Sequence, residues 1–281
     1  MLSPTDSRPS RFRHFGLLLS LCLSLAFAFN SDASRAESCN LEAGSDNLKI
    51  RVDGKTRRFL VLVGDEAAKS EKAPLLFVWH GFGGSASQAR RYVKPNRDWP
   101  EGIVVIPQGL DRRVAALGNR SAPGWQFAEG ELDDRDLKFF DAMYEQLTTT
   151  YCVDKTQVFS TGMSNGGFFS NLLGCSRASK LKGIAPTASG GPFAFCQRDL
   201  AVHITHGTSD AIVNYNQGMT SLETWSRYNG CRAPDNLPRS GCVMLEGCSQ
   251  PMQFCSHEGG HTWPNGTTDQ IIAFIRQLAP K

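Results

Sequence analysis

The sequence lacks several patterns that would point to metal or nucleic-acid chemistry. It has nine cysteines, yet no two are spaced as Cys-x-x-Cys, and its six histidines are not spaced as metal ligands beside them. A zinc site is therefore not expected. Basic runs interleaved with aromatic residues are missing, which gives no support for nucleic-acid binding. Nor is there an internal repeat or a Pro/Ser/Thr-rich linker, which argues against an appended binding module.

A hydrophobic run long enough to cross a membrane is also missing, although the amino terminus is apolar. Arginines within residues 8–13 precede an apolar stretch at 15–29, which is shorter than the roughly 20 residues of a spanning helix. Ser34-Arg35-Ala36 then completes the pattern of a secretory signal that is cleaved after Ala36. We expect residues 1–36 to be a signal peptide, and the mature protein to be secreted without further membrane contact.

Removal of residues 1–36 leaves eight cysteines, an even number that favours disulfide bonds in an exported protein. The sequence alone does not establish how they pair. Four of them are clustered, and we expect these to pair among themselves and brace the segment that precedes His261. The clustered cysteines are Cys231, Cys242, Cys248 and Cys255, and the others are Cys39, Cys152, Cys175 and Cys196.

The mature chain has little net charge and the length of one domain. The first 36 residues carry four arginines and two aspartates, so the formal charge falls from +3 to +1 when they are removed. This balance implies no electrostatic partner. About 245 residues suit a single α/β domain with a full core. We expect residues 37–281 to form that domain and the protein to be a monomer.

Apolar runs of strand length alternate with segments of helical periodicity. The expected strands are a hairpin, 48–52 and 57–63 around Asp53-Gly54, followed by 74–79, 102–106, 157–160, 181–185, 200–205 and 251–255. Helices are expected near 137–147, 168–173 and 271–278. Such alternation predicts a mostly parallel sheet with helices on both faces and ligands at the carboxyl ends of the strands.

Ser164 stands in a Gly-x-Ser-x-Gly pattern directly after one of these strands. Gly162 and Gly166 flank it, and a helix is expected to follow. Small neighbours permit a strained turn between strand and helix that holds the serine hydroxyl at the tip of the sheet. The pattern therefore predicts that Ser164 is a nucleophile.

In α/β-hydrolases the acid that assists such a serine follows it in chain order, from a loop after a strand. Asp210 lies just after the expected strand 200–205, so its carboxylate can reach above the sheet. Asp199 precedes that strand and lies at its wrong end. Asp235 falls in the cysteine-rich segment, where no expected strand positions it. Asp210 is therefore the predicted acid.

His261 is the predicted base, since it follows Gly259-Gly260 just beyond the strand 251–255. A glycine loop can bring its imidazole to the serine. His257 is an alternative, because it directly adjoins the same strand. His203 is expected inside a strand, and His206 is expected to brace the loop of Asp210 through hydrogen bonds.

Two backbone N–H groups are needed for an oxyanion hole. Asn165, the residue after the nucleophile, is expected to supply one, and Phe82 in the glycine-rich loop 80–84 the other. This loop has neither the Gly-x-Gly-x-x-Gly spacing nor the lysine of a phosphate-binding loop, which makes phosphate a poor alternative. Trp125 and Trp263 are candidate walls for an aromatic or sugar-bearing substrate, with ordinary packing as the alternative for both.

Four motifs together resemble the secreted feruloyl esterases and polyhydroxybutyrate depolymerases. They are WHGFGG at 79–84, TGMSNGG at 161–167, HGTSD at 206–210 and GGHTWP at 259–264. The resemblance runs from about residue 48 to the carboxyl terminus. It implies the α/β-hydrolase fold and ester hydrolysis by Ser164, Asp210 and His261, without metal or cofactor.

We interpret the chain as a serine carboxylic-ester hydrolase that releases feruloyl or acetyl groups from plant cell-wall polysaccharide. Depolymerisation of polyhydroxybutyrate or its oligomers is an alternative activity. A catalytically inactive binding protein on the same scaffold is disfavoured, because the serine, acid and base are all present. An acyltransferase would use the same three residues, and only its products would distinguish it.

Overall fold

A computed structural model describes residues 41–115, 118–196, 198–232 and 236–279. The chain separates into two units, Met1–Glu37 and Ser38–Lys281, and all described residues belong to the second. The predicted signal at 1–36 lies outside the described residues, as do Cys39 and Asp235. Within the described ranges, no helix combines the length and apolar character needed to cross a membrane.

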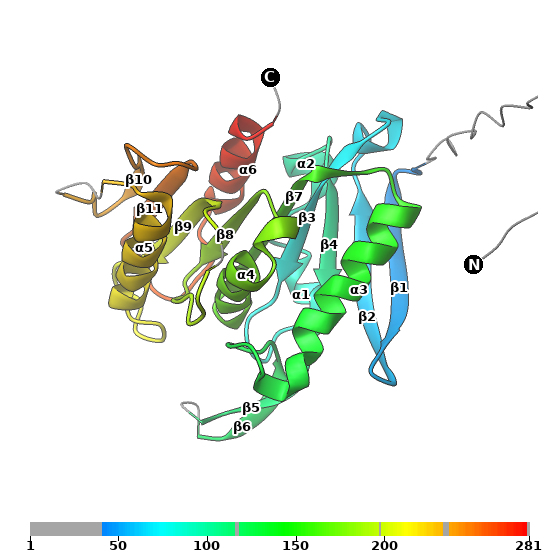
Figure 1. Ribbon diagram of the computed structural model, residues 1–281, viewed down its shortest axis with the longest axis horizontal. Coiled ribbons are helices and arrows are strands. Elements are labelled where there is room, and N and C mark those ends of the chain that lie inside the picture. Colours follow the sequence, from blue (N-terminus) through cyan, green and yellow to red (C-terminus); the bar gives the residue numbers. More distant parts are fainter. Residues whose placement is uncertain (1–40, 116–117, 197, 233–235, 280–281) are drawn as a thin grey trace, which may run out of the picture. The chain divides into compact units, whose positions relative to one another are not determined.

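A sheet of nine strands runs through the described part of the second unit (Figure 1). Its strands are, in spatial order, β1 (Gly44–Val52), β2 (Lys55–Val63), β4 (Ile103–Pro107), β3 (Ala73–Trp79), β7 (Val153–Met163), β8 (Gly183–Thr187), β9 (Ala201–Gly207), β11 (Met252–His257) and β10 (Gly241–Met244). The strands from β4 to β11 are parallel, whereas β1, β2 and β10 join antiparallel at the edges. The predicted, mostly parallel sheet is confirmed.

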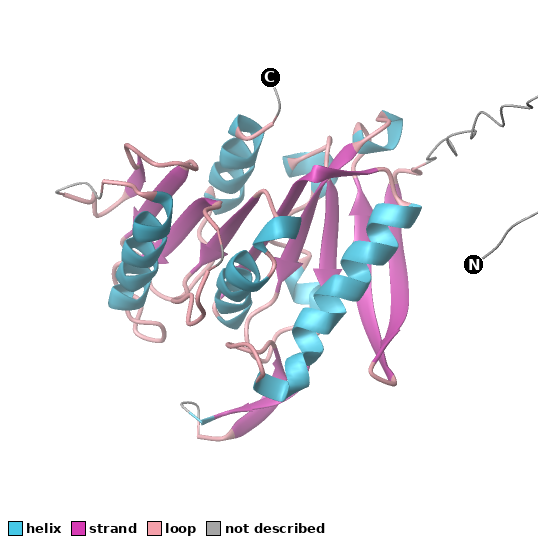
Figure 2. Ribbon diagram, in the orientation of Figure 1, coloured by secondary structure: helices cyan, strands magenta, loops and turns pink. Residues whose placement is uncertain are grey.

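Helices cover both faces of this sheet, as Figure 2 shows. They are α1 (Ala86–Ala89), α2 (Pro95–Asp98), α3 (Arg135–Thr150), α4 (Asn165–Ser176), α5 (Tyr215–Asn229) and α6 (Thr267–Gln277), with single 3₁₀ turns η1 (Ala67–Lys69), η3 (Glu131–Asp134) and η4 (Ala178–Lys180). One core packs α3, α4 and α5 against the sheet, and the other packs α1 and α6. In β3, Phe77 belongs to the first core and Val78 to the second, because successive side chains of a strand point to opposite faces. Strands buried on both faces read as continuous apolar runs.

The opening hairpin depends on its two-residue turn. Asp53 and Gly54 both have positive φ angles, 47° and 75°, as the predicted tight turn between antiparallel strands requires. Sequence reasoning missed a second hairpin, β5 (Leu110–Val114) with β6 (Arg120–Gly124), as well as β10 and α5. The hairpin strands and β10 are short and contain charged residues or glycine, so their pairing depends on neighbours rather than on their own pattern. In α5, by contrast, Tyr215, Met219 and Leu222 recur at helical spacing, a signal that sequence reasoning overlooked.

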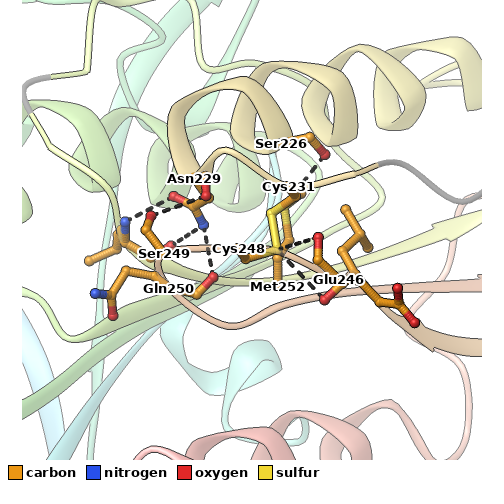
Figure 3. Close-up of a disulfide and its surroundings, with 10 residues drawn as sticks. Ser226, Asn229, Cys231, Glu246, Cys248, Ser249, Gln250 and Met252 are labelled. Atoms are coloured by element: carbon orange, nitrogen blue, oxygen red, sulfur yellow. Dashed lines mark hydrogen bonds between the residues drawn. A yellow bond between two sulfur atoms is a disulfide. The ribbon is translucent and has the colours of Figure 1, made fainter.

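Three disulfides link six of the described cysteines: Cys175–Cys196, Cys231–Cys248 and Cys242–Cys255. The four clustered cysteines therefore pair among themselves, as predicted. Cys242 and Cys255 lie directly opposite each other on β10 and β11. Figure 3 shows Cys231–Cys248 just after α5, beside the hydrogen bond that the Ser249 hydroxyl donates to the Asn229 carbonyl, 3.1 Å. The Cys231–Cys248 bridge ties the end of α5 to the segment before β11, and the Cys242–Cys255 bridge ties β10 to β11.

Candidate active site

Ser164 connects the end of β7 to the start of α4 in the strained turn that the sequence predicts. Its φ and ψ angles are 56° and −124°, outside the regions that residues with side chains usually adopt. A Cβ atom on Gly166 would lie 2.2 Å from the carbonyl oxygen of Trp79, and one on Gly162 would lie 2.6 Å from the Gly166 backbone. Only glycine fits at these two positions, so the close packing of β3, β7 and α4 enforces the turn.

His261 and Asp210 come together from two different loops. His261 Nδ1 lies 2.7 Å from Asp210 Oδ2, while Asp210 Oδ1 accepts the N–H groups of Ile212 and Val213, both at 2.9 Å. Burial opposes ionisation of Asp210, but the hydrogen bonds from His261 and the two amides outweigh it and hold the pKa of the carboxyl below its ordinary value. The carboxylate thus orients the imidazole and leaves Nε2 as the nitrogen that can accept a proton.

The structure brings Asp210 and His261 together, whereas no hydrogen bond joins His261 to Ser164. Ser164, Asp210 and His261 all follow the carboxyl ends of parallel strands, β7, β9 and β11, in the order that the sequence predicts. Contacts between a nucleophile and its base often tighten only in the complex with substrate. The geometry is therefore compatible with the predicted pairing of Ser164 and His261, which stays a prediction.

His206 supports the Asp210 loop, as the sequence predicts. Its Nε2 lies 2.8 Å from the carbonyl oxygen of Val213 and 3.6 Å from Asp210 Oδ2. Burial lowers the pKa of His206 more than these neighbours raise it, so the ring stays neutral. His203, also as predicted, lies inside β9, where its ring contacts Gln253 Oε1 at 2.8 Å.

The alternative base, His257, has other contacts. Its Nδ1 accepts the N–H of Gly259 at 3.1 Å, and its carbonyl oxygen accepts the N–H of Thr208 at 2.8 Å. The buried Nε2 has no hydrogen-bond partner among the described residues. No hydrogen bond joins this ring to Asp210, so the contacts favour His261 as the base.

The glycine-rich loop after β3 lies against the nucleophile. A Cβ atom on Gly81 would contact Ser164 Cβ at 3.4 Å, and the N–H of Gly83 is bonded to the carbonyl of Pro123 at 2.8 Å. Within the described ranges, neither the N–H of Phe82 nor that of Asn165 has an acceptor. Both N–H groups are therefore free to donate, and their role in an oxyanion hole stays a prediction.

His80 anchors this loop from within, a part that sequence reasoning missed. The ring is buried, and its Nε2 accepts the N–H of Gly109 at 3.0 Å, so the proton resides on Nδ1, 2.8 Å from the carbonyl of Gly81. Burial lowers the pKa of His80 more than the Gly81 contact raises it. A neutral histidine thus fixes the first peptide of the loop. Its position directly after the strand could have suggested such a role.

The prediction that Trp125 forms a wall of the substrate-binding site is wrong. Its side chain is 0% exposed, packs edge-on against Trp79, stacks with Phe169, and donates its indole N–H to the His80 carbonyl at 2.8 Å. Substrate cannot reach it, because Trp79, Phe169 and His80 of the glycine-rich loop enclose it. Sequence reasoning had no means of distinguishing this packed tryptophan from an exposed one.

Trp263, the second proposed wall, is half-buried. Its ring stacks on Tyr92 with centroids 4.5 Å apart, and its N–H donates to Thr268 Oγ1 at 3.1 Å. These contacts fix the side chain of Trp263, which follows His261 by two positions in the sequence. Its contact with substrate stays a prediction.

Other parts of the described structure add no candidate site for the chemistry. Among the described residues, no three His, Cys, Asp or Glu side chains are grouped as metal ligands would be. A cavity of about 570 Å³ lies at the opposite ends of the strands, lined by Leu62, Val63 and basic residues of 90–97. None of the predicted site residues lines it, so the cavity volume does not indicate where the reaction takes place.

The chain is similar in sequence to named fungal esterases, although no protein-family model matches it. Feruloyl esterase D of Neurospora crassa is 29% identical over 90% of this chain and 89% of its own length. Feruloyl esterase C of Emericella nidulans is 31% identical over 73% of this chain and 76% of its own length.

Solved structures share the fold at lower identity. An acetyl xylan esterase from Aspergillus awamori matches 84% of this chain and all of its own, at 14% identity and a TM-score of 0.62. The Bacillus cereus carboxylesterase matches 79% of this chain and 95% of its own, at 17% identity and a TM-score of 0.58. These structures confirm the α/β-hydrolase fold. The sequence matches to the fungal enzymes show that the chain is a carboxylic-ester hydrolase and belongs to the feruloyl esterase family.

Proposed function

We propose that the protein is a secreted serine esterase in which Ser164, His261 and Asp210 form the catalytic triad. The observation that carries this assignment is the 2.7 Å contact between His261 and Asp210, at the same edge of the sheet as a serine in a strained turn. A buried carboxylate bonded to Nδ1 selects the imidazole tautomer that can accept a proton at Nε2. The arrangement supports nucleophilic catalysis, because a serine hydroxyl needs such a base to attack an ester.

In this mechanism His261 Nε2 removes the proton from Ser164 Oγ as the oxygen attacks the ester carbonyl. Asp210 stabilises the imidazolium that forms. The N–H groups of Phe82 and Asn165 donate to the oxyanion, and His261 then returns the proton to the departing alcohol. Water, deprotonated by the same base, attacks the acyl-serine and releases the carboxylic acid.

Substrates of the proposed reaction are feruloyl or acetyl esters of plant cell-wall polysaccharide. The names of the sequence relatives support feruloyl esters, and the acetyl xylan esterase that shares the fold extends the proposal to acetyl groups. Three disulfides among the described residues support secretion, since such bonds persist in oxidising compartments. We propose that the enzyme acts as a monomer without metal or cofactor.

Substitutions of the triad test the assignment. Ser164→Ala and His261→Ala should each lower turnover on methyl ferulate by about 10⁶, because nucleophile and base act as a unit. His257→Ala is the matched control, since this histidine adjoins the same loop but has no bond to Asp210. Thermal unfolding should verify that each variant is folded. Retention of a tenth of the activity in the serine variant, or a greater loss at His257, would refute the triad.

A further inference from the structure

Three phenylalanines form an aromatic ladder beside the nucleophile. The ring of Phe168 lies 5.3 Å, centroid to centroid, from that of Phe127 in an edge-on contact, and 5.7 Å from that of Phe193 in a stacked one. Phe127 and Phe168 are partly exposed, and Phe193 is 58% exposed. The ladder therefore ends in an open aromatic face that no described residue stacks upon.

The ladder begins one helical turn from Ser164. The N–H of Phe168 donates to the Ser164 carbonyl at 2.9 Å in the first turn of α4. Side chains in a helix point back toward its amino terminus, so the Phe168 ring covers the turn that carries the nucleophile. One turn corresponds to about 5.4 Å along the helix. A group held on the ladder is thus close to the reacting carbonyl but separated from it by a spacer.

The loop that carries Phe193 is fixed in place. Cys196 is bonded to Cys175 of α4, and Asn171 Nδ2 donates to the carbonyl of Gly190 at 2.9 Å. A Cβ atom on Gly190 would lie 3.1 Å from the Phe168 ring, so the glycine lets the loop approach the ladder closely. An aromatic face held this way needs no reordering when a ligand stacks on it.

We infer that Phe127, Phe168 and Phe193 form the acyl-binding platform of the enzyme and select esters of planar aromatic acids. This inference rests on the proposed function. The two-carbon spacer of a hydroxycinnamoyl group places its ring away from the carbonyl, where it can stack on the ladder. An acetyl group is too short to extend one helical turn. The platform therefore discriminates by the acid rather than by the alcohol of the ester.

Phe193→Ala tests the platform, with Phe195→Ala as its matched control. Both side chains are exposed on the same loop, but the Phe195 ring contacts Tyr228 and does not belong to the ladder. Phe193→Ala should lower kcat/KM for methyl ferulate about tenfold, which equals about 1.4 kcal/mol. Acetylated xylo-oligosaccharide should be hydrolysed as before. Phe195→Ala should change neither rate by more than about twofold.

Two further variants distinguish stacking from simple apolar contact. Phe193→Trp should retain the preference for methyl ferulate, whereas Phe193→Leu should lose most of it, because only an aromatic side chain provides a π face. Equal losses on both substrates, a loss confined to the acetylated sugar, or equal effects of the two alanine variants would overturn the platform. If wild-type enzyme hydrolyses both esters in these cases, the proposed function stands. Absence of Ser164-dependent hydrolysis in the wild-type enzyme would overturn both proposals.

Discussion

The side chain of Asn165 and the main chain of Trp125 are joined by two reciprocal hydrogen bonds. The N–H of Trp125 donates to Asn165 Oδ1 at 2.7 Å, and Asn165 Nδ2 donates to the Trp125 carbonyl at 2.9 Å. Both residues are buried. A buried carboxamide that satisfies two backbone groups connects the start of α4 to the segment after β6. It thereby fixes the residue whose N–H is one of the two proposed oxyanion donors.

Removal of this pair should impair both stability and the proposed oxyanion hole. Asn165→Ala leaves the N–H of Trp125 buried and unpaired, which should cost about 2 to 3 kcal/mol of unfolding free energy. Displacement of the oxyanion donor should lower kcat about 10²-fold with little change in KM, because the donor acts mainly in the transition state. Asn165→Asp retains an oxygen that can accept the N–H of Trp125 but loses the N–H that donates to the Trp125 carbonyl, so its stability and kcat should be lowered as well. Urea unfolding and steady-state kinetics measure the two effects. An unchanged kcat in a folded variant would contradict the proposal that the Asn165 N–H donates to the oxyanion.

The pH dependence of stability should report on His203. Burial lowers its pKa from 6.5 to about 4, so the folded protein keeps this ring neutral. Between these values the unfolded chain binds the proton and the folded one does not, so the free energy of unfolding must fall as the pH falls. The contribution is fully present above pH 6.5. It should decrease by about 2 kcal/mol between pH 7 and pH 5.

His203→Asn is the variant that isolates this effect, since it removes the titrating ring and leaves an amide near Gln253. Urea unfolding of both proteins at pH 7 and pH 5 should show a smaller decrease in the variant. Groups elsewhere titrate equally in the two proteins and cancel in the comparison. Parallel pH profiles would mean that His203 is not the group responsible.

Thiol content tests the predicted set of four disulfides. Three bridges are present among the described residues, and Cys152 is the buried cysteine left over within them. If all eight cysteines of the mature chain are oxidised, the remaining pair must be Cys39 with Cys152. Peptide mapping without reductant should yield this fourth cross-link. Alkylation of Cys152 in denaturant without reductant would contradict the fourth bridge and show that the enzyme has only the other three.

Substrate choice should favour soluble aromatic esters over polyester. We expect kcat/KM to be greater for methyl ferulate and for acetylated xylo-oligosaccharide than for hydroxybutyrate trimers, with little clearing of a polymer suspension. Phe193, Phe195 and Ile212 are exposed, but the ring of Phe193 belongs to the aromatic ladder, which suits a planar aromatic acid better than an aliphatic chain. Faster cleavage of the trimers, or rapid clearing of the suspension, would instead favour depolymerisation of polyhydroxybutyrate as the activity of the enzyme.

The sequence by itself determined the features that depend on local chemistry. Asp53-Gly54 predicted the hairpin because few residue pairs tolerate two positive φ angles. Apolar runs predicted the parallel strands, since strands buried on both faces need no polar alternation. Glycines on both sides of Ser164 predicted its strained turn, and chain order together with the preceding strands predicted the loops of Asp210 and His261.

Only the tertiary structure decided the features that depend on distant segments. Trp125 is enclosed by Trp79, His80 and Phe169, from β3, the loop after it and α4, so its own neighbours in sequence could not reveal its burial. The aromatic ladder likewise joins residues 127, 168 and 193 from three separate segments. Local patterns encode turns and periodicity, whereas burial and stacking depend on which surfaces the folded chain brings together. For that reason the substrate wall predicted at Trp125 was wrong, while the loops of Asp210 and His261 were predicted from the sequence.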